Sequence, residues 1–532
     1  MADWPILSIL IFLPLVGVAF IVLVRGTDPA SVENIRRVAL ITTVFNFAAS
    51  FALWVLFDPV EPAFQFVEKR TWIAGLANYH VGVDGISMPF VVLVAALMPF
   101  CVLVSYTKIT DRVRQFMVAL LVLETLLIGA FCALDLVLFY IFFAGSTLPL
   151  LVIIGGWGGA RRISAAYKFF QFSLASSGVL LLSLIALFFA GETSDIVVLQ
   201  GLEFSEGLQL WLWLALFIAF AIAMALWPVH TWMVDAVAEA PAAAAALVCA
   251  VGVKLGFYGF ARLVLPLFPE ASAGLSWLGL ALGLVTIGAA SLLALVQRDL
   301  MKMIAYAAMV PMGFALLALF ALNQQSVQGA LVVVVGHGVA VAALIFAAAA
   351  ITQRANTGEI TAYGGLAGKM PWLSAILLVA TLSVVFVPGT VGFVGAFLAF
   401  VGVFEASPLL ALIAAVGLLA ASAAGFMLYS KVVLGPLETE AMRRMTDLSM
   451  REKLSLAPLA LLVVIFGIFP QSLLTVSEAS VNRLVAQHER ATATTTGPLI
   501  DTTVFAVEGS TSEAVRQGIH ASGVAPGVDL DQ

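Results

Sequence analysis

Apolar residues along this chain form long runs that short polar stretches interrupt. Each run approaches the roughly 20 apolar residues that a helix needs to cross a hydrocarbon core of about 30 Å. The pattern therefore predicts an all-α polytopic membrane protein with about fourteen transmembrane helices and almost no strands. The predicted spans cover residues 5–24, 37–57, 86–106, 114–132, 134–155, 167–190, 209–230, 242–264, 274–296, 301–322, 325–350, 372–396, 408–433 and 454–474.

Few polar segments are long enough to lie outside the membrane. The loop from Asp58 to Gly85 is the largest insertion, and beyond Val481 polar residues continue to Gln532, which predicts an extramembrane tail. The predicted organisation is a three-helix N-terminal segment, a first five-helix repeat, a second five-helix repeat, a C-terminal helix with its linker, and the polar tail. Their boundaries are 1–107, 108–265, 266–434, 435–481 and 482–532.

Prolines interrupt two of the predicted spans. Pro228 lies in the seventh span, and Pro388, followed by Gly389, lies in the twelfth. Proline removes a backbone donor and clashes with the preceding turn, so helices seven and twelve should be discontinuous. Two breaks five helices apart predict two inverted repeats with a working site near the breaks, as in many transporters. A kinked but inert helix is the alternative for either break.

Composition narrows the class of protein. Hydrophobic residues make up 62% of the chain and charged residues 11%, against about 25% charged in soluble domains. A soluble enzyme, a nucleic-acid-binding protein and a disordered scaffold are thereby excluded. Cys101, Cys132 and Cys249 lie far apart in apolar runs, which indicates buried side chains and predicts no metal site.

Basic residues indicate the orientation of the chain. Lysine and arginine concentrate in alternate loops, such as the one with Arg161 and Arg162, and these loops should face the cytoplasm. With an even number of helices, both termini would lie on the periplasmic side of a bacterial inner membrane. The run from Pro5 to Val24 lacks a basic flank and a cleavage site, so we expect it to be a retained span.

Ionisable side chains inside spans are functional candidates, because each costs about 2.5–3.5 kcal/mol to insert. Lys254 lies well inside the eighth span, where burial favours a neutral amine that can take up and release a proton. Snorkelling of Lys254 to an interface is the alternative. His337, in the middle of the eleventh span, could relay protons or be a neutral core histidine bonded to a carbonyl. Glu124 lies in the fourth span.

Further candidates lie nearer the ends of spans. Asp135 and Lys168 begin the fifth and sixth spans, where they could join a proton path or face water and headgroups. His230 follows the break in the seventh span and, with Asp235, could stabilise the opened helix end. Lys302 begins the tenth span and is a further proton-transfer candidate.

Several stretches, in the same order, resemble the M-type antiporter-like membrane subunit of bacterial NADH:quinone oxidoreductase (respiratory complex I), in the family shared with Mrp-type antiporter subunits. The long lateral helix typical of the L-type subunit is not predicted. The stretches that carry the resemblance are His80–Ser87 (HVGVDGIS), Leu134–Tyr140 (LDLVLFY), Trp227–Trp232 (WPVHTW), Met301–Tyr306 (MKMIAY), Pro388–Gly395 (PGTVGFVG) and Asp447–Lys453 (DLSMREK).

The resemblance implies a proton-handling translocase subunit with no catalytic centre of its own. It implies that this chain binds no cofactor, and that NADH, FMN, iron–sulfur clusters and quinone belong to partner subunits. The expected partners are L-like and N-like membrane-arm chains and the lipid bilayer, with no nucleic acid. In this family a carboxylate on the fifth span pairs with a lysine on the seventh, and a lysine on the eighth continues the route to a carboxylate on the twelfth.

This chain departs from that pattern. Lys254 occupies the eighth-span lysine position and His337 is retained, but Ala144, Ala223 and Ala396 occupy the other three channel positions. Pro311 replaces a histidine of the tenth span. A buried ion pair must lose both partners together, because an orphan charge costs several kcal/mol. We therefore expect an impaired or silent proton channel.

Other functions share this fold. The alternatives are a subunit of an Mrp-type cation/proton antiporter, a subunit of a membrane-bound hydrogenase or carbon-uptake complex, and a purely structural membrane spacer. Transport by this chain alone would need a complete coupling path, which the missing carboxylates argue against.

Overall fold

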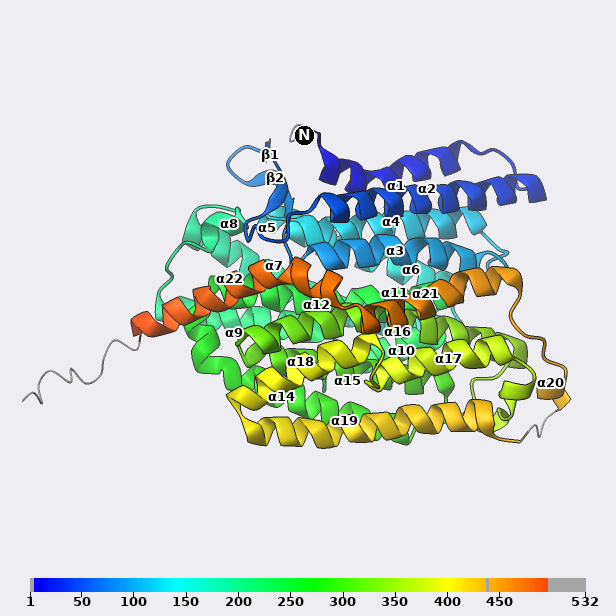
Figure 1. The fold of residues 1–532 in the computed structure, drawn as a ribbon. Coiled ribbons are helices and arrows are strands. Elements are labelled where there is room, and N and C mark those ends of the chain that lie inside the picture. Colours follow the sequence, from blue (N-terminus) through cyan, green and yellow to red (C-terminus); the bar gives the residue numbers. More distant parts are fainter. Residues whose placement is uncertain (1–3, 437–439, 496–532) are drawn as a thin grey trace, which may run out of the picture.

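Long helices lie side by side along a common direction and form the bulk of the molecule (Figure 1). The computed structural model describes residues 4–436 and 440–495. The first elements are α1 (Ile6–Leu23), α2 (Pro29–Leu56), β1 (Gln65–Ile73), β2 (Ala77–Val83), α3 (Met88–Ser105) and α4 (Val113–Cys132). The next are α5 (Leu136–Gly145), α6 (Thr147–Trp157), α7 (Arg162–Gly191), α8 (Ile196–Leu199), α9 (Glu206–Ala223), α10 (Thr231–Glu239), α11 (Ala242–Leu247), α12 (Val253–Gly259) and α13 (Leu265–Leu267).

The second half of the molecule is also helical. Two π-helical segments, Val248–Gly252 and Phe260–Val264, flank α12, and a third, Ser430–Leu434, follows α19. Short 3-10 turns cover Ile360–Ala362 and Leu366–Gly368. The remaining helices are α14 (Pro269–Leu295), α15 (Leu300–Phe320), α16 (Gln324–Ala355), α17 (Pro371–Val384), α18 (Val391–Ala406), α19 (Pro408–Tyr429), α20 (Glu440–Arg443), α21 (Met450–Ile468) and α22 (Gln471–Thr495).

The described residues confirm a polytopic helical membrane protein. They contain twelve helices that are long and apolar enough to cross a membrane, or thirteen if α21 and α22, bent by 66°, form one span. The predicted span 372–396 is divided between two shorter apolar helices, α17 and α18. The difference from the predicted fourteen spans therefore comes from helices that break or bend within an apolar run.

Both predicted helix breaks are present. Pro228 lies in the turn between α9 and α10, and Pro388 lies between α17 and α18. A residue with positive φ precedes each proline, Ala225 at 56° and Phe386 at 60°. These left-handed residues end the helices, and the proline that follows prevents their continuation.

The two breaks share one hydrogen-bond pattern. The N–H of Leu226 donates to the carbonyl of Ala221 at 3.1 Å, and the N–H of Val387 donates to that of Leu382 at 2.9 Å. Each bond joins residues five positions apart and closes the end of a broken helix. This likeness supports the predicted pair of repeats, while their inverted relation stays a prediction.

The prediction of almost no strands is wrong for the loop between residues 58 and 85. β1 and β2 form an antiparallel hairpin there, with Glu68 opposite Val81 and Arg70 opposite Tyr79. Most of β1 is exposed, so its charged residues obscured the alternation that normally reveals a strand.

The predicted boundary between 435–481 and 482–532 is also wrong, because α22 runs through it to Thr495. Buried Leu473, Val476, Val481 and Leu484 recur at helical spacing along α22. This apolar face packs against α14 and α16. The rest of the predicted tail, 496–532, lies outside the described residues.

Candidate functional site

Lys254 lies on α12, the short α-helical segment between two π-helical segments of the eighth predicted span. Its side chain is fully buried. Two residues farther on, a Cβ added at Gly256 would lie 2.6 Å from the backbone nitrogen of Met224. Glycine therefore allows α12 to approach the break after α9 directly, and π-helical turns of this kind are frequent at functional sites.

Neutral groups surround the Lys254 amine. Nζ donates to the carbonyl of Cys249 at 2.9 Å, lies 2.8 Å from Nδ1 of His337 and lies 3.6 Å from the sulfur of Met312. No Asp or Glu forms an ion pair with Lys254 in the part of the chain that the structure describes. Full burial also excludes the snorkelling alternative.

His337, on α16, is the nearest titratable partner of Lys254. The ring is buried, and among the described residues Nε2 has no hydrogen-bond partner. A charged lysine can only donate, so Nδ1 then accepts and the proton of the neutral imidazole lies on Nε2. Two neighbouring bases can share one positive charge but cannot both carry one cheaply.

Two positions at which the sequence predicts a lost channel residue lie on helices packed against α12, namely α9 and α15. Ala223, at the end of α9, lines a cavity of about 50 Å³ together with Phe143, Ser146 and Leu255. The cavity can hold water but contains no ionisable lining group. Pro311, on α15, directly precedes Met312, whose sulfur contacts Lys254.

The two remaining channel positions lie in helices of the same bundle. Ala144 lies on α5, next to Phe143 of the cavity wall, and Ala396 lies buried on α18, directly after the second break. Their methyl groups cannot exchange protons.

A second group of predicted residues gathers around α10. Lys168, on α7, forms an ion pair with Asp235 on α10 at 2.8 Å. The His230 ring lies 5.8 Å from the ring of Tyr306 on α15. Lys302 begins that same helix, where the carboxylate of Asp299 caps its backbone N–H. These residues make no hydrogen bond or ion pair with Lys254.

Asp135 has the geometry of a helix cap. It is fully buried, and its Oδ1 accepts hydrogen bonds from the backbone N–H groups of Val137 and Leu138. Oδ2 accepts from the backbone of Asn78 in the hairpin and from Ser194. Of the two alternatives for Asp135, exposure to water or headgroups does not fit this burial, and the structure does not bring Asp135 to Lys254.

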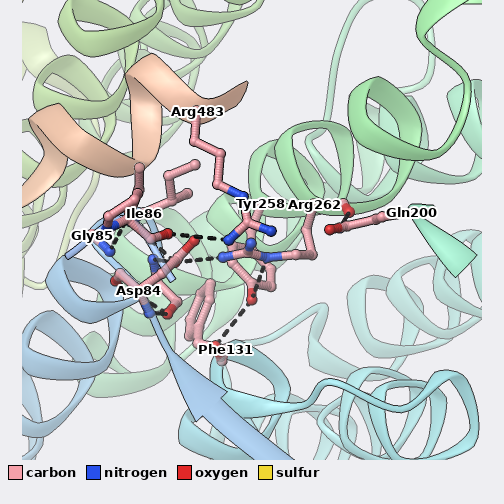
Figure 2. Close-up of polar contacts among 11 residues, drawn as sticks. Asp84, Gly85, Ile86, Phe131, Gln200, Tyr258, Arg262 and Arg483 are labelled. Carbon is pink, nitrogen blue, oxygen red and sulfur yellow. Dashed lines mark hydrogen bonds and ion pairs between the residues drawn. The ribbon is translucent and has the colours of Figure 1, made fainter. Parts of the chain in front are cut away.

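A buried ion pair that the sequence did not reveal joins Asp84, directly after β2, to Arg262 in the π-helical segment that follows α12 (Figure 2). Arg262 donates from Nη2 to Oδ1 of Asp84 at 2.5 Å and from Nε to the hydroxyl of Tyr258 at 3.2 Å. Burial raises the pKa of Asp84, but the charge and hydrogen bond of Arg262 outweigh it and lower the pKa below its usual value. The sequence offered one signal of this pair: Arg262 follows Lys254 by eight residues within one apolar run.

The sequence also did not reveal the partner of Glu124. Asn46, on α2, donates from Nδ2 to Oε1 of Glu124 on α4 at 2.7 Å, and both residues are fully buried. The two remaining oxygens, Oδ1 of Asn46 and Oε2 of Glu124, have no partner among the described residues. A protonated Glu124 would donate to Asn46 and satisfy both, so the pair fits a neutral carboxylic acid.

Comparison with protein families gives one matching model. Residues 133–422 match the family described as NADH:quinone oxidoreductase/Mrp antiporter, TM. The matched range contains Lys254, His337, both helix breaks and the four positions at which channel residues are predicted to be lost.

Similar sequences extend over nearly the whole chain. Subunit M of NADH-quinone oxidoreductase from Rhodobacter capsulatus is 41% identical over 91% of this chain and 97% of that protein. The Rickettsia conorii subunit M is 37% identical over 92% of this chain and 100% of that protein. NADH-ubiquinone oxidoreductase chain 4 of Marchantia polymorpha is 37% identical over 91% of this chain and 97% of that protein.

Solved structures share the fold. A chain of respiratory complex I from Thermus thermophilus superposes with a TM-score of 0.79 at 27% identity, covering 90% of this chain and 99% of that one. A chain of the Mrp complex from a Dietzia species gives a TM-score of 0.79 at 18% identity, covering 91% and 99%, which shows the shared fold alone. This chain therefore belongs to the NADH:quinone oxidoreductase and Mrp antiporter family and, within it, to the M-type, antiporter-like membrane subunits of complex I.

Proposed function

We propose that this M-type subunit works in the membrane arm of a proton-translocating NADH:quinone oxidoreductase while its own proton channel is impaired or silent. The observation that carries the proposal is the environment of Lys254. Its Nζ contacts a carbonyl, a thioether and an imidazole, and Ala223, a predicted channel position, lines a cavity in which no described residue is ionisable.

A proton relay needs neighbouring groups that bind and release protons in turn. Moving charge onto or off Lys254 requires a nearby group of opposite sign, because an isolated buried charge is expensive. The alanines at 144, 223 and 396 supply none. Lys254 and His337 can exchange a proton between themselves, but that exchange moves no charge across the membrane.

The remaining parts of the assembly follow from the family. In this proposal the chain has no catalytic centre, and NADH, FMN, iron–sulfur clusters and quinone are bound by partner subunits. L-like and N-like membrane subunits are its neighbours. The alternating distribution of basic residues supports a place in a bacterial inner membrane with both termini on the periplasmic side.

The test is the proton-to-electron ratio of the intact complex in sealed vesicles, with this chain as the sole M-type subunit. We expect a ratio lower than that of a complex whose M-type subunit retains the channel residues. Ala144→Glu combined with Ala223→Lys restores one ion pair and is the matched gain-of-function variant. A full ratio in the unmodified complex contradicts a silent channel.

The loss of the channel residues also favours a purely structural spacer as a second candidate. The two candidates differ in whether Lys254 changes its protonation state during turnover. Infrared difference spectra of the intact complex, compared between the native chain and Lys254→Met, distinguish them. A turnover-linked lysine signal that this substitution removes excludes the spacer.

A further inference from the structure

The helix that carries Lys254 continues as a polar face toward the hairpin end of the molecule. Tyr258 and Arg262 follow Lys254 at intervals of four residues, and Arg262 bonds to Asp84, which directly follows β2. We propose that Arg262, Asp84 and Tyr258 form a seal, called here the Arg262 seal, that prevents protons from passing between Lys254 and the surface at the hairpin end.

Residues four positions apart lie on one face of a helix. The bond from Nε of Arg262 to the Tyr258 hydroxyl, at 3.2 Å, shows that these two side chains point the same way. The Tyr258 hydroxyl in turn donates to the carbonyl of Phe131 at 3.0 Å (Figure 2). A proton leaving Lys254 toward the hairpin end along this helix would therefore meet Tyr258 first and Arg262 next.

Aromatic rings close the path at the level of Tyr258. Phe90 on α3 and Phe131 on α4 stack with centroids 4.9 Å apart, and Tyr258 meets the edge of Phe131 at 5.2 Å. All three side chains are fully buried. Water enters a protein interior only where polar partners hold it, so a packed aromatic layer excludes the water chain that proton transfer needs.

A permanent positive charge lies directly beyond this layer. Arginine stays protonated inside proteins, and Arg262 as a residue is only 4% exposed. It borders a cavity of about 20 Å³ that Asp84, Gln200, Ser480 and Arg483 also line. Water can therefore reach Arg262 from the hairpin end, where a fixed cation repels protons, as arginines do in selective pores.

Contacts from other elements hold the pair in place. Oδ1 of Asp84 accepts a hydrogen bond from the backbone N–H of Ser87 at 3.0 Å as well as the one from the Arg262 guanidinium. Above the pair, the Ser480 hydroxyl of α22 accepts the backbone N–H of Gly85 at 2.9 Å. Arg483 extends from α22 toward the same cavity and donates to the carbonyl of Pro62 at 3.3 Å (Figure 2).

The experiment measures passive proton entry into vesicles that contain the intact complex, without NADH, under an imposed membrane potential. Arg262→Met combined with Asp84→Leu removes both charges without leaving an orphan. We expect roughly tenfold faster proton entry than with the native complex, since the fixed cation beyond Tyr258 is gone and protons that reach Lys254 can cross by the impaired route that remains. Adding Lys254→Ala should return the rate to the native value, because Lys254 is the inner end of the path.

The matched control is Arg483→Met, which changes a cation of the same cavity outside the Arg262–Asp84 pair and should leave the rate unchanged. A native rate in the assembled double variant overturns the seal, and so does fast entry that persists with Lys254→Ala. If the double variant does not assemble, Phe90→Ala opens the aromatic layer while keeping the ion pair. Fast entry is expected there too, and a native rate overturns the proposal.

The seal goes beyond the proposed function. Proton entry is measured without turnover, whereas the silent channel is tested by the proton-to-electron ratio during turnover. A full proton-to-electron ratio, with slow passive proton entry in the native complex, would contradict the silent channel alone. A low ratio, with passive proton entry unchanged in the Arg262 variants, would contradict the seal alone.

Discussion

Lys254 and His337 illustrate what single residues contribute to this protein. Their nitrogen atoms lie 2.8 Å apart, although 83 positions separate them in the sequence. The sequence marked both as buried ionisable residues, because each lies inside an apolar run. It could not pair them, since their contact depends on how α12 and α16 pack and the apolar pattern does not encode that packing. The same limit applies to Asn46 with Glu124 and to Asp84 with Arg262.

Replacing Lys254 with methionine should have a small effect on stability. The substitution removes a buried cation but leaves Nδ1 of His337 without its donor, so the two effects oppose each other within about 2 kcal/mol. Thermal unfolding of the detergent-solubilised complex measures the change. With a silent channel, the proton-to-electron ratio should also stay at its native value, and a clear fall would contradict that expectation.

Glu124→Gln should be tolerated, whereas Glu124→Leu should destabilise the contact between α2 and α4. Glutamine can form the same two-point contact with the Asn46 amide that a protonated glutamate forms. Leucine leaves that amide buried and unpaired, which costs about 1–3 kcal/mol. The transition temperatures of the two variant complexes provide the comparison, and equal values would argue against a neutral acid–amide pair.

At the hairpin, Asp195 should stabilise the fold throughout the neutral pH range. Burial raises its pKa, but hydrogen bonds from His80 and Lys69 outweigh it and hold the pKa below the usual value. A lowered folded-state pKa contributes stability above the unfolded value of about 3.9, and this contribution is lost as the pH falls through the folded-state value.

Asp195→Asn should therefore increase amide hydrogen exchange in residues 65–83 at neutral pH. The expected cost is about 1–2 kcal/mol. Glu61→Gln, on the exposed loop before β1, is a matched control that should leave exchange unchanged. Unchanged exchange in the variant at neutral pH would contradict the stabilising role of Asp195.

At the scale of elements, the sequence predicted where helices break more reliably than where they end. Pro228 and Pro388 marked both breaks, because the chemistry of proline is local. The hairpin and the extension of α22 were missed because their apolar faces become evident only against β2, α14 and α16. In α22 the buried positions recur at helical spacing, but the polar composition obscured them.

Gly256→Ala tests the close approach of α12 to the break after α9. A Cβ at this position would lie 2.6 Å from backbone nitrogen, so the helices must separate at a cost of about 1–3 kcal/mol. Gly274→Ala on α14 is the matched control, because nothing lies within 4 Å of its added Cβ. Thermal stability should fall for the first variant only, and equal stability would contradict the tight contact.

At the scale of the whole molecule, apolar side chains cover the outside of the bundle. Phe45 on α2, Leu182 on α7, Leu292 on α14 and Leu419 on α19 are more than half exposed, as expected of surfaces that face lipid or neighbouring subunits. Composition alone predicted this property, since charged residues are too few to cover a water-exposed surface.

The chain should therefore remain in the membrane pellet when vesicles are extracted with alkaline carbonate. Moving apolar surface from lipid into water costs roughly 25 cal/mol per Å². The hydrophobic spans therefore stay in the bilayer at high pH. Immunodetection of pellet and supernatant measures the distribution, with a peripheral subunit of the same complex as the control. Recovery in the supernatant would contradict an integral membrane protein.

The two π-helical segments around α12 have a mechanical consequence. Each holds one residue more in its turn than an α-helix does. If one segment gives up its extra residue while the other gains one, the seven residues of α12 rotate by about 100° and both ends of the span stay in place. Lys254 would then turn away from His337 by a local change in winding, and α9 would have to give way where Gly256 now contacts Met224.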